Sequence, residues 1–303
     1  MNADQLPLWS IVIPYYNEEP FIERTLACAL ALRGPAFQLI LVNNDSDDRS
    51  EELCRKMLAR VPQIDVKMVF EARPGPSHAL EAGLEHVQTP YVALWNADTW
   101  YPEDYLARAE ALLEEPDVVA AMAIDIYAPP RSFKGWLRRV HRRNMSLMMA
   151  RQTHTGTFGQ CFRTDVLRAA GGPRSENWPW VLDDHELMQR VFRFGRSRYH
   201  ADFWCMPSAR RSRNAHVRWT LFERLVYHAT PYQLKDWFFY DFLAGRFAAR
   251  GMRNANLRDR DWTGQGAADP EQPHGAEVAF VDRSAPTRSP IFSGVDARRG
   301  PGS

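Results

Sequence analysis

The sequence predicts an α/β fold: a Rossmann-like, mostly parallel sheet with flanking helices and a helical C-terminal extension. Two observations predict it. Within residues 1–125, apolar runs of strand length alternate with segments that have the apolar period of a helix. After residue 218 the chain carries aromatic, basic stretches of helical length. Repeated βα units of this length imply parallel strands joined by right-handed crossovers.

The expected elements of the first part follow in order. A strand over 9–14 precedes a helix whose N-cap is predicted at Asn17 and whose apolar stripe includes Ile22 and Leu26. The remaining elements are strand 39–42, helix 50–59, strand 66–70, helix 77–87, strand 91–95, helix 103–114 and strand 118–122. Most of these strands are largely apolar, as in a sheet that is covered on both faces.

Beyond residue 125 the simple alternation stops. A basic stretch over 131–151 is interpreted as a helical connection, and two aromatic helices are expected over 219–229 and 232–250. From about residue 254 the composition is rich in Gly, Pro, Ala, Arg and Asp. Such a segment cannot bury enough apolar surface to offset its chain entropy, so residues 253–303 are expected to form a disordered tail.

Composition and charge restrict the function classes. The chain has 303 residues, 45% of them hydrophobic, and a formal net charge of +1. This balance gives no general attraction for nucleic acid, so an anionic partner must be bound by a local patch. The four cysteines show no paired spacing, no signal segment is evident, and no apolar run approaches the about 20 residues that span a bilayer. We expect a cytoplasmic protein whose membrane contact, if any, is peripheral and at the inner face.

Polar clusters follow two of the predicted strands. Asn43-Asn44-Asp45 follows strand 39–42, and Asn96-Ala97-Asp98 follows strand 91–95. A third cluster, Asp183-Asp184, opens a predicted helix. Open α/β sheets bind ligands at the carboxyl ends of their strands. Because clustered carboxylates and amides are costly without a cation or a hydrogen-bonding partner, the pattern favours a metal-bound, phosphate-bearing ligand.

The placement of these motifs resembles the family 2 glycosyltransferases, which are inverting enzymes of GT-A fold. Four segments carry the resemblance: SIVIPYYNEE over 10–19, NNDSDD over 43–48, NADT over 96–99, and the stretch from GGP at 171–173 to DDHEL at 183–187. It covers roughly residues 9–215. It implies a nucleotide-sugar-binding half over 1–125, an acceptor-side half of the same domain over 126–215, and C-terminal helices over 216–252.

The resemblance implies a nucleotide pocket. The positions that it assigns to nucleotide binding are Pro14, Tyr16, Glu18, Asn43, Asp45, Arg73 and Asn96. Asn43 stands where the family usually has Asp. An Asn side chain both accepts from and donates to a uracil edge, whereas a carboxylate only accepts, so a UDP-sugar is favoured. A polar strand-end turn with a surface Arg73 is the structural alternative.

The resemblance also implies a metal site. Asn96-Ala97-Asp98 is similar to the family's Asp-x-Asp signature, whose last carboxylate binds Mn²⁺ or Mg²⁺ against the diphosphate. Asp98 is therefore the predicted metal ligand. Asn96 removes one negative charge, which should weaken metal binding in the absence of nucleotide. Capping of the helix near Pro102 is the alternative role, and His216 is either an added ligand or a surface histidine.

The third implied site is catalytic. Helical spacing from the predicted buried stripe, which includes Leu187 and Met188, places Asp184 toward the interior and Asp183 to its side. Asp184 matches the family's general base, which deprotonates the acceptor hydroxyl during a displacement that inverts the anomeric carbon. An acidic helix N-terminus without catalytic role is the alternative. Trp180, Arg210 and Arg211 are the predicted contacts to acceptor or phosphates.

The sequence thus predicts a metal-dependent, inverting glycosyltransferase. It would move a sugar from a nucleotide-sugar to a hydroxyl of a saccharide or lipid-linked saccharide, in surface glycan synthesis. The basic segment over 131–151 and the aromatic helices could rest on an anionic membrane. Two other classes stay open. A non-catalytic sugar-nucleotide-binding protein is suggested by Asn43 and Asn96, and a sugar nucleotidyltransferase would need a Gly-rich, Arg-bearing loop that residues 14–17 do not offer.

Overall fold

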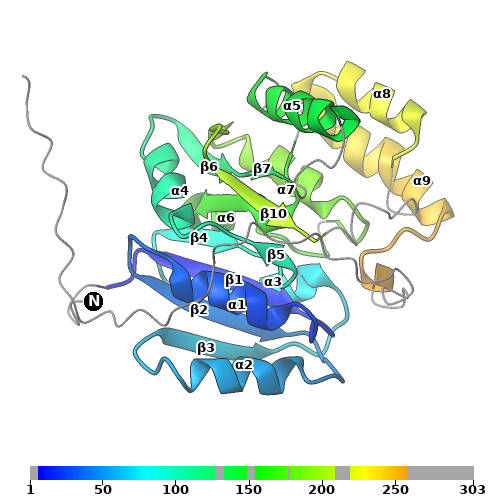
Figure 1. Cartoon of the computed structure of the whole chain (residues 1–303). Coiled ribbons are helices and arrows are strands. Elements are labelled where there is room, and N and C mark those ends of the chain that lie inside the picture. The colour runs from blue at the N-terminus through cyan, green and yellow to red at the C-terminus, as the bar shows by residue number, and fades with distance from the viewer. Residues whose placement is uncertain (1–5, 127–132, 149–153, 177, 209–218, 258–303) are drawn as a thin grey trace, which may run out of the picture.

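The structure is a computed structural model that describes residues 6–126, 133–148, 154–176, 178–208 and 219–257. A central sheet carries helices on both faces, and a separate group of helices lies at one end of the molecule (Figure 1). The main sheet has seven strands in the order β3-β2-β1-β4-β8-β6-β9, and a second sheet has three in the order β5-β10-β7. The predicted α/β fold with a mostly parallel sheet is confirmed.

The first part alternates strand and helix as predicted. Its elements are β1 (Trp9–Tyr15), α1 (Ile22–Ala31), β2 (Phe37–Asn43), α2 (Ser50–Leu58), β3 (Asp65–Phe70), α3 (Pro76–Leu84), β4 (Tyr91–Leu94), β5 (Thr99–Trp100), α4 (Tyr105–Leu113) and β6 (Val118–Met122). β1 pairs in parallel with β2 and β4, and β2 pairs in parallel with β3. The carboxyl ends of these four strands therefore meet at one edge of the sheet.

The second part is less regular than the first. Its elements are β7 (Ile124–Asp125), α5 (Phe133–Met148), η1 (Thr157–Gly159), β8 (Gln160–Arg163), α6 (Thr164–Ala169), α7 (Asp183–Val191), β9 (Arg196–Arg198), β10 (Trp204–Pro207), α8 (Leu221–Ala229), η4 (Tyr232–Leu234), η5 (Trp237–Leu243), α9 (Ala244–Ala249) and η6 (Ala255–Leu257). β8 runs antiparallel to β4 and β6. β5 and β7 to β10 were not predicted, because strands of two to four residues show no measurable alternation.

Three apolar clusters hold the layers together. Trp9, Ile11 and Ile13 of β1 pack with α1, α2 and α4 on one face of the sheet. Val12, in the same strand, packs with α3, α6 and α7 on the other face. The third cluster joins the C-terminal helices to the loop before α7; its buried members are Trp178, Val181, Tyr227, Phe238, Phe239, Leu243, Phe247 and Met252. The C-terminal helices are thus part of the folded body.

Two local predictions are wrong. Asn17 does not cap a helix: α1 begins at Ile22, and the Asn17 side chain donates from Nδ2 to Asp47 Oδ1 at 2.5 Å and accepts from the Asp47 N–H at 3.0 Å. Its backbone takes φ 51°, a left-handed value that Asn tolerates. The predicted tail is also folded at its start, because Asn254 is 3% exposed. Residues 258–303 lie outside the described residues.

The described residues also bear on the membrane prediction and on the cysteines. None of the helices in the described ranges has both the length and the hydrophobicity to cross a bilayer.

The four cysteines are not paired with one another: Cys28, Cys54, Cys161 and Cys205 are all buried free thiols. The basic segment over 131–151 forms a helix over 133–148, as predicted.

Candidate active site

The connection between β4 and β5 holds the predicted metal ligand. Asp98 is 5% exposed, and its Oδ2 accepts a hydrogen bond from Ser208 Oγ at 2.8 Å. The Ser208 N–H also donates to the Asp98 carbonyl at 3.0 Å. The preceding Asn96 is buried, and its N–H donates to Tyr101 Oη at 3.0 Å. The antiparallel pairing of β10 with β5 brings Ser208 to Asp98 across 110 residues of sequence.

The surroundings of Asp98 fit a cation that is bound together with a phosphate ligand. Within the described ranges, no group of three or more His, Cys, Asp or Glu side chains could hold a metal ion by itself. Mg²⁺ and Mn²⁺ bind through one or two carboxylates when phosphate oxygens and water complete the shell. The predicted alternative, a helix cap, is wrong, because α4 begins at Tyr105 with Asp104 at its N-cap position.

Asn43, the last residue of β2, lies beside the carboxylate of Glu51 in α2. Asn43 is 5% exposed; its Nδ2 donates to Glu51 Oε2 at 2.6 Å, and its Oδ1 accepts from the Ser46 N–H at 2.8 Å. Hydrogen bonds from Arg55 and then Asn43 lower the pKa of Glu51. Glu51 was not among the predicted site residues, because its sequence signal is only that of an acidic residue in the first turn of a helix. Glu51 therefore places a negative charge next to Asn43, which itself lacks the charge of the family's usual Asp.

The other predicted nucleotide-binding residues lie on the same edge of the sheet. Pro14 lies in β1, and Glu18, just beyond that strand, is buried with its N–H donating to Ser50 Oγ at 2.9 Å. Tyr16 is partly buried, and Asp45 is exposed in the loop after β2 with φ 63°.

Arg73 lies in the loop between β3 and α3. Asn44 shapes this loop: its Nδ2 donates to the carbonyls of Glu71 and Arg73, both at 2.8 Å, and its Oδ1 accepts from the Gly75 N–H at 3.0 Å. The Arg73 guanidinium pairs with Glu71 at 2.7 Å and lies 3.7 Å from Glu81. Arg73 is thus at the predicted edge, with its charge already paired to carboxylates.

The acid pair opens α7, as predicted. Leu182 just before it has φ 64°, which turns the chain into the helix. Asp183 Oδ2 accepts from Ser77 Oγ at 2.9 Å and from Asn254 Nδ2 at 2.8 Å. Asp184 Oδ1 lies 3.0 Å from His185 Nδ1, and the Asp184 side chain is 16% exposed.

The environment of Asp183 changes its proton affinity. Burial raises the pKa of Asp183 to about 6, the charge of Asp184 adds to the rise, and the hydrogen bonds from Ser77 and Asn254 oppose it. A carboxylate with such a pKa is mostly ionised at neutral pH and still accepts a proton readily. Helical spacing singled out Asp184 as the inward residue. Both side chains are partly exposed, and Asp183 is the one that contacts α3, through the hydrogen bond from Ser77.

Asp98 and the acid pair share one edge of the sheet. Ser77, which contacts Asp183, lies in the first turn of α3, the next element after β3, and Asp98 follows β4. Since β3 and β4 belong to the parallel set, both groups lie beyond the carboxyl ends of the strands. The predicted Trp180 contacts Arg253, whose guanidinium lies 5.2 Å from the Trp180 ring. Arg210, Arg211 and His216 lie outside the described residues.

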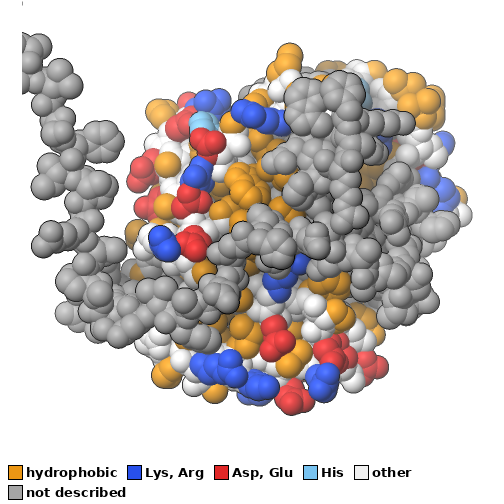
Figure 2. Space-filling view, viewed as in Figure 1, with side chains coloured by type: hydrophobic (Ala, Val, Ile, Leu, Met, Phe, Trp, Pro, Cys, Tyr) orange, Lys and Arg blue, Asp and Glu red, His pale blue; other side chains and the backbone are white. Residues whose placement is uncertain are grey.

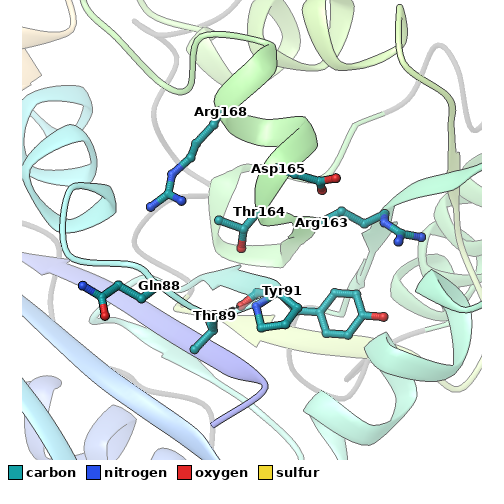
Figure 3. A pocket seen from close by; sticks show the side chains of 8 residues that line it. Gln88, Thr89, Tyr91, Arg163, Thr164, Asp165 and Arg168 are labelled. Atoms are coloured by element: carbon teal, nitrogen blue, oxygen red, sulfur yellow. Dashed lines mark hydrogen bonds between the residues drawn. The ribbon is translucent and has the colours of Figure 1, made fainter. Parts of the chain in front are cut away.

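A pocket of about 330 Å³ lies at the opposite edge of the sheet (Figure 3). It is formed where β4 begins, at Tyr91, and where β8 ends, at Arg163. Arg168, on α6, donates to the carbonyl of Val87. The pocket is therefore separate from the strand ends that carry the predicted site.

Comparison with protein families decides where the chain belongs. Residues 10–172, more than half of the chain, match the model of glycosyl transferase family 2. The chain belongs to this family. The match ends before Asp183 and Asp184, so it covers the predicted nucleotide and metal positions but not the acid pair.

Curated relatives match about half of this family 2 member. The undecaprenyl-phosphate 4-deoxy-4-formamido-L-arabinose transferase of Edwardsiella ictaluri is 28% identical over 170 residues, which are 53% of this chain and 50% of that protein. The transferase of the same name from Pseudomonas aeruginosa (strain LESB58) is 32% identical over 158 residues, 50% of this chain and 44% of that protein. The chain spans about half the length of the curated relatives it matches.

Solved structures show the same fold over more of the chain. The mannosyltransferase PcManGT from Pyrobaculum calidifontis, solved with GDP-Man and Mn²⁺, has a TM-score of 0.59 and 20% identity, over 82% of this chain and 74% of that one. S. aureus TarS 1-349 in complex with UDP-GlcNAc has a TM-score of 0.55 and 15% identity, over 79% of this chain and 72% of that one. This likeness establishes the GT-A fold.

Proposed function

We propose that this chain is an inverting, metal-dependent glycosyltransferase. It transfers a sugar from a nucleotide-sugar, for which we favour a UDP-sugar, to a hydroxyl of a saccharide or lipid-linked saccharide in surface glycan synthesis. The observation that carries the proposal is the buried Asp98 on the same sheet edge as the pair Asp183 and Asp184. Relatives named as undecaprenyl-phosphate sugar transferases support the proposal. Structural neighbours solved with nucleotide-sugars support it as well.

The donor in this proposal binds along the strand ends. Asn43 forms hydrogen bonds to the base, and Glu51 holds the Asn43 side chain by accepting a hydrogen bond from it. The loop with Tyr16 and Glu18 lies under the nucleoside. Pro14, Asp45, Arg73 and Asn96 complete the nucleotide contacts, and Arg210 and Arg211 bind phosphate or acceptor. Asp98 holds a Mn²⁺ or Mg²⁺ ion. When bound, the cation supplies positive charge next to the diphosphate leaving group.

The acceptor hydroxyl in this proposal loses its proton to Asp184. Its oxygen forms a bond to the anomeric carbon while the bond from that carbon to the diphosphate oxygen breaks, and the electron pair leaves with the diphosphate. A single displacement inverts the anomeric configuration. Asp183, held by Ser77, positions the start of α7 for this step, and Trp180 lies on the acceptor side.

The decisive test measures release of nucleoside diphosphate from UDP-, GDP-, dTDP- and CMP-sugars in the presence of Mn²⁺. Asp184→Asn is expected to lower the rate by about 10²- to 10⁴-fold, because it removes the proton acceptor. Its affinity for the nucleotide, measured by calorimetry, should stay unchanged. Asp165→Asn, an exposed carboxylate at the other sheet edge, serves as control and should keep the wild-type rate.

Two outcomes would contradict the proposal. An undiminished rate in Asp184→Asn removes Asp184 from the chemistry. Nucleotide binding without turnover of any donor would favour the alternative of a non-catalytic sugar-nucleotide-binding protein.

We also propose that the outer face of α8 and η5 rests on an anionic membrane at the cytoplasmic side. Leu221 is 75% exposed, Leu225 59% and Trp237 49%. Hydrophobic side chains are exposed at the upper right of Figure 2, where Figure 1 places α8. Arg246 lies 5.6 Å from the ring of Phe222, which is itself 56% exposed. Apolar side chains bordered by arginine are typical of interfacial helices, and buried free thiols suit a reducing compartment.

Flotation with vesicles tests this contact. Wild type should float with vesicles that contain anionic lipid and less with neutral ones. Replacing Leu221, Phe222 and Leu225 together by Gln should abolish flotation without unfolding, since all three side chains are exposed. Phe70→Gln changes an equally exposed aromatic residue on β3 and should float like wild type. If wild type does not float with anionic vesicles, the proposal of a membrane contact is wrong.

A further inference from the structure

The C-terminal segment after α9, residues 252–256, returns to the acid pair. The Val181 N–H donates to the Met252 carbonyl at 3.0 Å, and the Asn254 N–H donates to the Pro179 carbonyl at 3.0 Å. Between these bonds, Trp180 and Arg253 form an antiparallel bridge. Backbone hydrogen bonds therefore fix this segment along the loop that leads into α7.

Asn254 is the side chain of this segment that reaches the acid pair. It is 3% exposed, and its Nδ2 donates to Asp183 Oδ2 at 2.8 Å and lies 3.0 Å from Ser77 Oγ. Ser77 Oγ donates to the same Asp183 oxygen at 2.9 Å. Three segments that are far apart in the sequence thus meet at one carboxylate oxygen.

The loop between β3 and α3 packs closely against this segment. Gly75 has φ 118°, and a Cβ on it would lie 3.3 Å from Ala255 Cα and 3.5 Å from Asn254 Oδ1. Asn44 holds the Gly75 N–H in place at 3.0 Å. The segment 252–256 therefore packs against both the loop before α7 and the loop before α3.

We propose that Asn254 is a positioning residue of the active site, which holds the Asp183 carboxylate so that the C-terminal segment completes a site built mainly from the N-terminal sheet. The role in turnover rests on the proposed function, whereas the positioning of Asp183 does not. An N–H donor stabilises the ionised form of a carboxylate, and a neutral amide does so without adding a charge. Asp in place of Asn would bring a further negative charge against the pair.

The charged groups around Asp183 decide the direction of the expected change. Asp184 faces it from α7 and opposes its ionisation. α3 contributes the neutral Ser77 and, next to it, His78, whose Nε2 lies 2.6 Å from Ser175 Oγ. The segment itself carries Arg253, whose guanidinium lies over Trp180. Loss of the Asn254 donor should therefore make Asp183 easier to protonate.

The experiment compares Asn254→Leu, which has a similar shape and no donor, with Asn254→Asp. The titration of the Asp183 carboxyl is followed by carbon NMR and assigned with Asp183→Asn. We expect its midpoint to rise by about one pH unit in Asn254→Leu and by more in Asn254→Asp. Asn256→Ala is the matched control, because Asn256 lies in the same segment, is exposed and donates to the Gly251 carbonyl. Its midpoint should equal that of wild type.

Turnover provides the second readout. The acid limb of the pH profile of kcat/KM should move in the same direction as the midpoint, while the Kd for the nucleotide stays constant. An unchanged midpoint in folded Asn254→Leu overturns the inference, and Asn254→Asp decides it if the Leu variant does not fold. If the midpoint moves but wild type turns over no sugar donor, the proposed function fails and the positioning of Asp183 stands.

Discussion

Two neutral side chains donate hydrogen bonds to the Asp183 carboxylate of the acid pair. Asp183 accepts from the Ser77 hydroxyl and the Asn254 amide, which satisfy its oxygen without cancelling its charge. Burial and the charge of Asp184 together raise the pKa of Asp183 to about 6. By contrast, Glu51 receives hydrogen bonds from the charged Arg55 and from Asn43, and its pKa is lowered. Asp183 thus receives its side-chain hydrogen bonds from neutral groups, whereas Glu51 receives one from a charged group.

The raised pKa of Asp183 predicts how stability changes with pH. Its folded value of about 6 lies above the value of about 4 in an unfolded chain, so the native state binds this proton more tightly. The resulting stabilisation is fully present below pH ~4 and is lost as the pH rises to ~6, at most about 3 kcal/mol. Asp183→Asn cannot ionise. Relative to wild type, it should therefore gain stability between pH ~4 and ~6.

Urea unfolding at several pH values measures this difference. Asp165→Asn removes an exposed carboxylate and provides the control. Parallel stability curves for wild type and Asp183→Asn over that pH range would show that burial does not raise the pKa of this group.

Helix α3 connects the sheet to the acid pair. It packs closely on β1 and β2, because a Cβ on Gly83 would lie 2.5 Å from Val12 Cγ1 and 3.0 Å from Val42 Cγ2. Its first turn carries Ser77, the donor to Asp183. The glycine lets the helix lie near enough to the strands to place that donor.

Two glycine substitutions separate this packing from helix propensity. Gly83→Ala should lower the free energy of unfolding by about 1–3 kcal/mol, because the methyl group meets buried valines. Gly245→Ala, in α9, should raise it by about 0.5–1 kcal/mol, because nothing lies within 4 Å of a Cβ there and Ala favours the helix. Thermal unfolding measures both. Equal stabilisation by the two changes would mean that α3 has room to move away from the sheet.

In the whole molecule, the site lies where the parallel sheet meets the C-terminal helices. The third apolar cluster attaches these helices to the loop before α7, through Trp178 and Val181 on the loop side. Inside this layer, Glu223 is fully buried and its Oε1 accepts from Arg246 at 2.8 Å and Arg250 at 2.6 Å. The extension therefore packs against the loop before the acid pair from outside the region that matches the family model.

Ligand binding should stabilise the whole molecule. With UDP and Mn²⁺ at 100 times the dissociation constant, wild type should gain about 2.7 kcal/mol, seen as a higher Tm. Asp98→Asn should lose most of the part that depends on Mn²⁺, because it removes the carboxylate proposed to bind the ion. Chelation by EDTA should lower the shift of wild type to that of the variant. A wild-type shift that is the same with Mn²⁺ and with EDTA would exclude the proposed metal dependence.

The sequence was sufficient for the regular part of the fold. Apolar runs such as 39–42 and 91–95 are long enough to show a period, and the polar residues that follow them had to lie at strand ends. The helix beginning at Asp183 was also predictable, since its stripe residues Leu187, Met188 and Val191 are all buried. The proposed roles of these residues stay predictions until they are tested.

Only the tertiary structure decided which distant side chains meet at the site. Ser208 reaches Asp98 through a four-residue strand with no visible alternation, and Asn254 contacts Asp183 from a segment whose composition predicted disorder. The physical reason is the separation in sequence between the residues that interact. Periodicity and composition report interactions between residues that are near in sequence, whereas these contacts depend on how separate elements pack together. The sequence by itself therefore determined the strands, the helices and the polar strand ends, and packing alone determined which groups surround the two carboxylates.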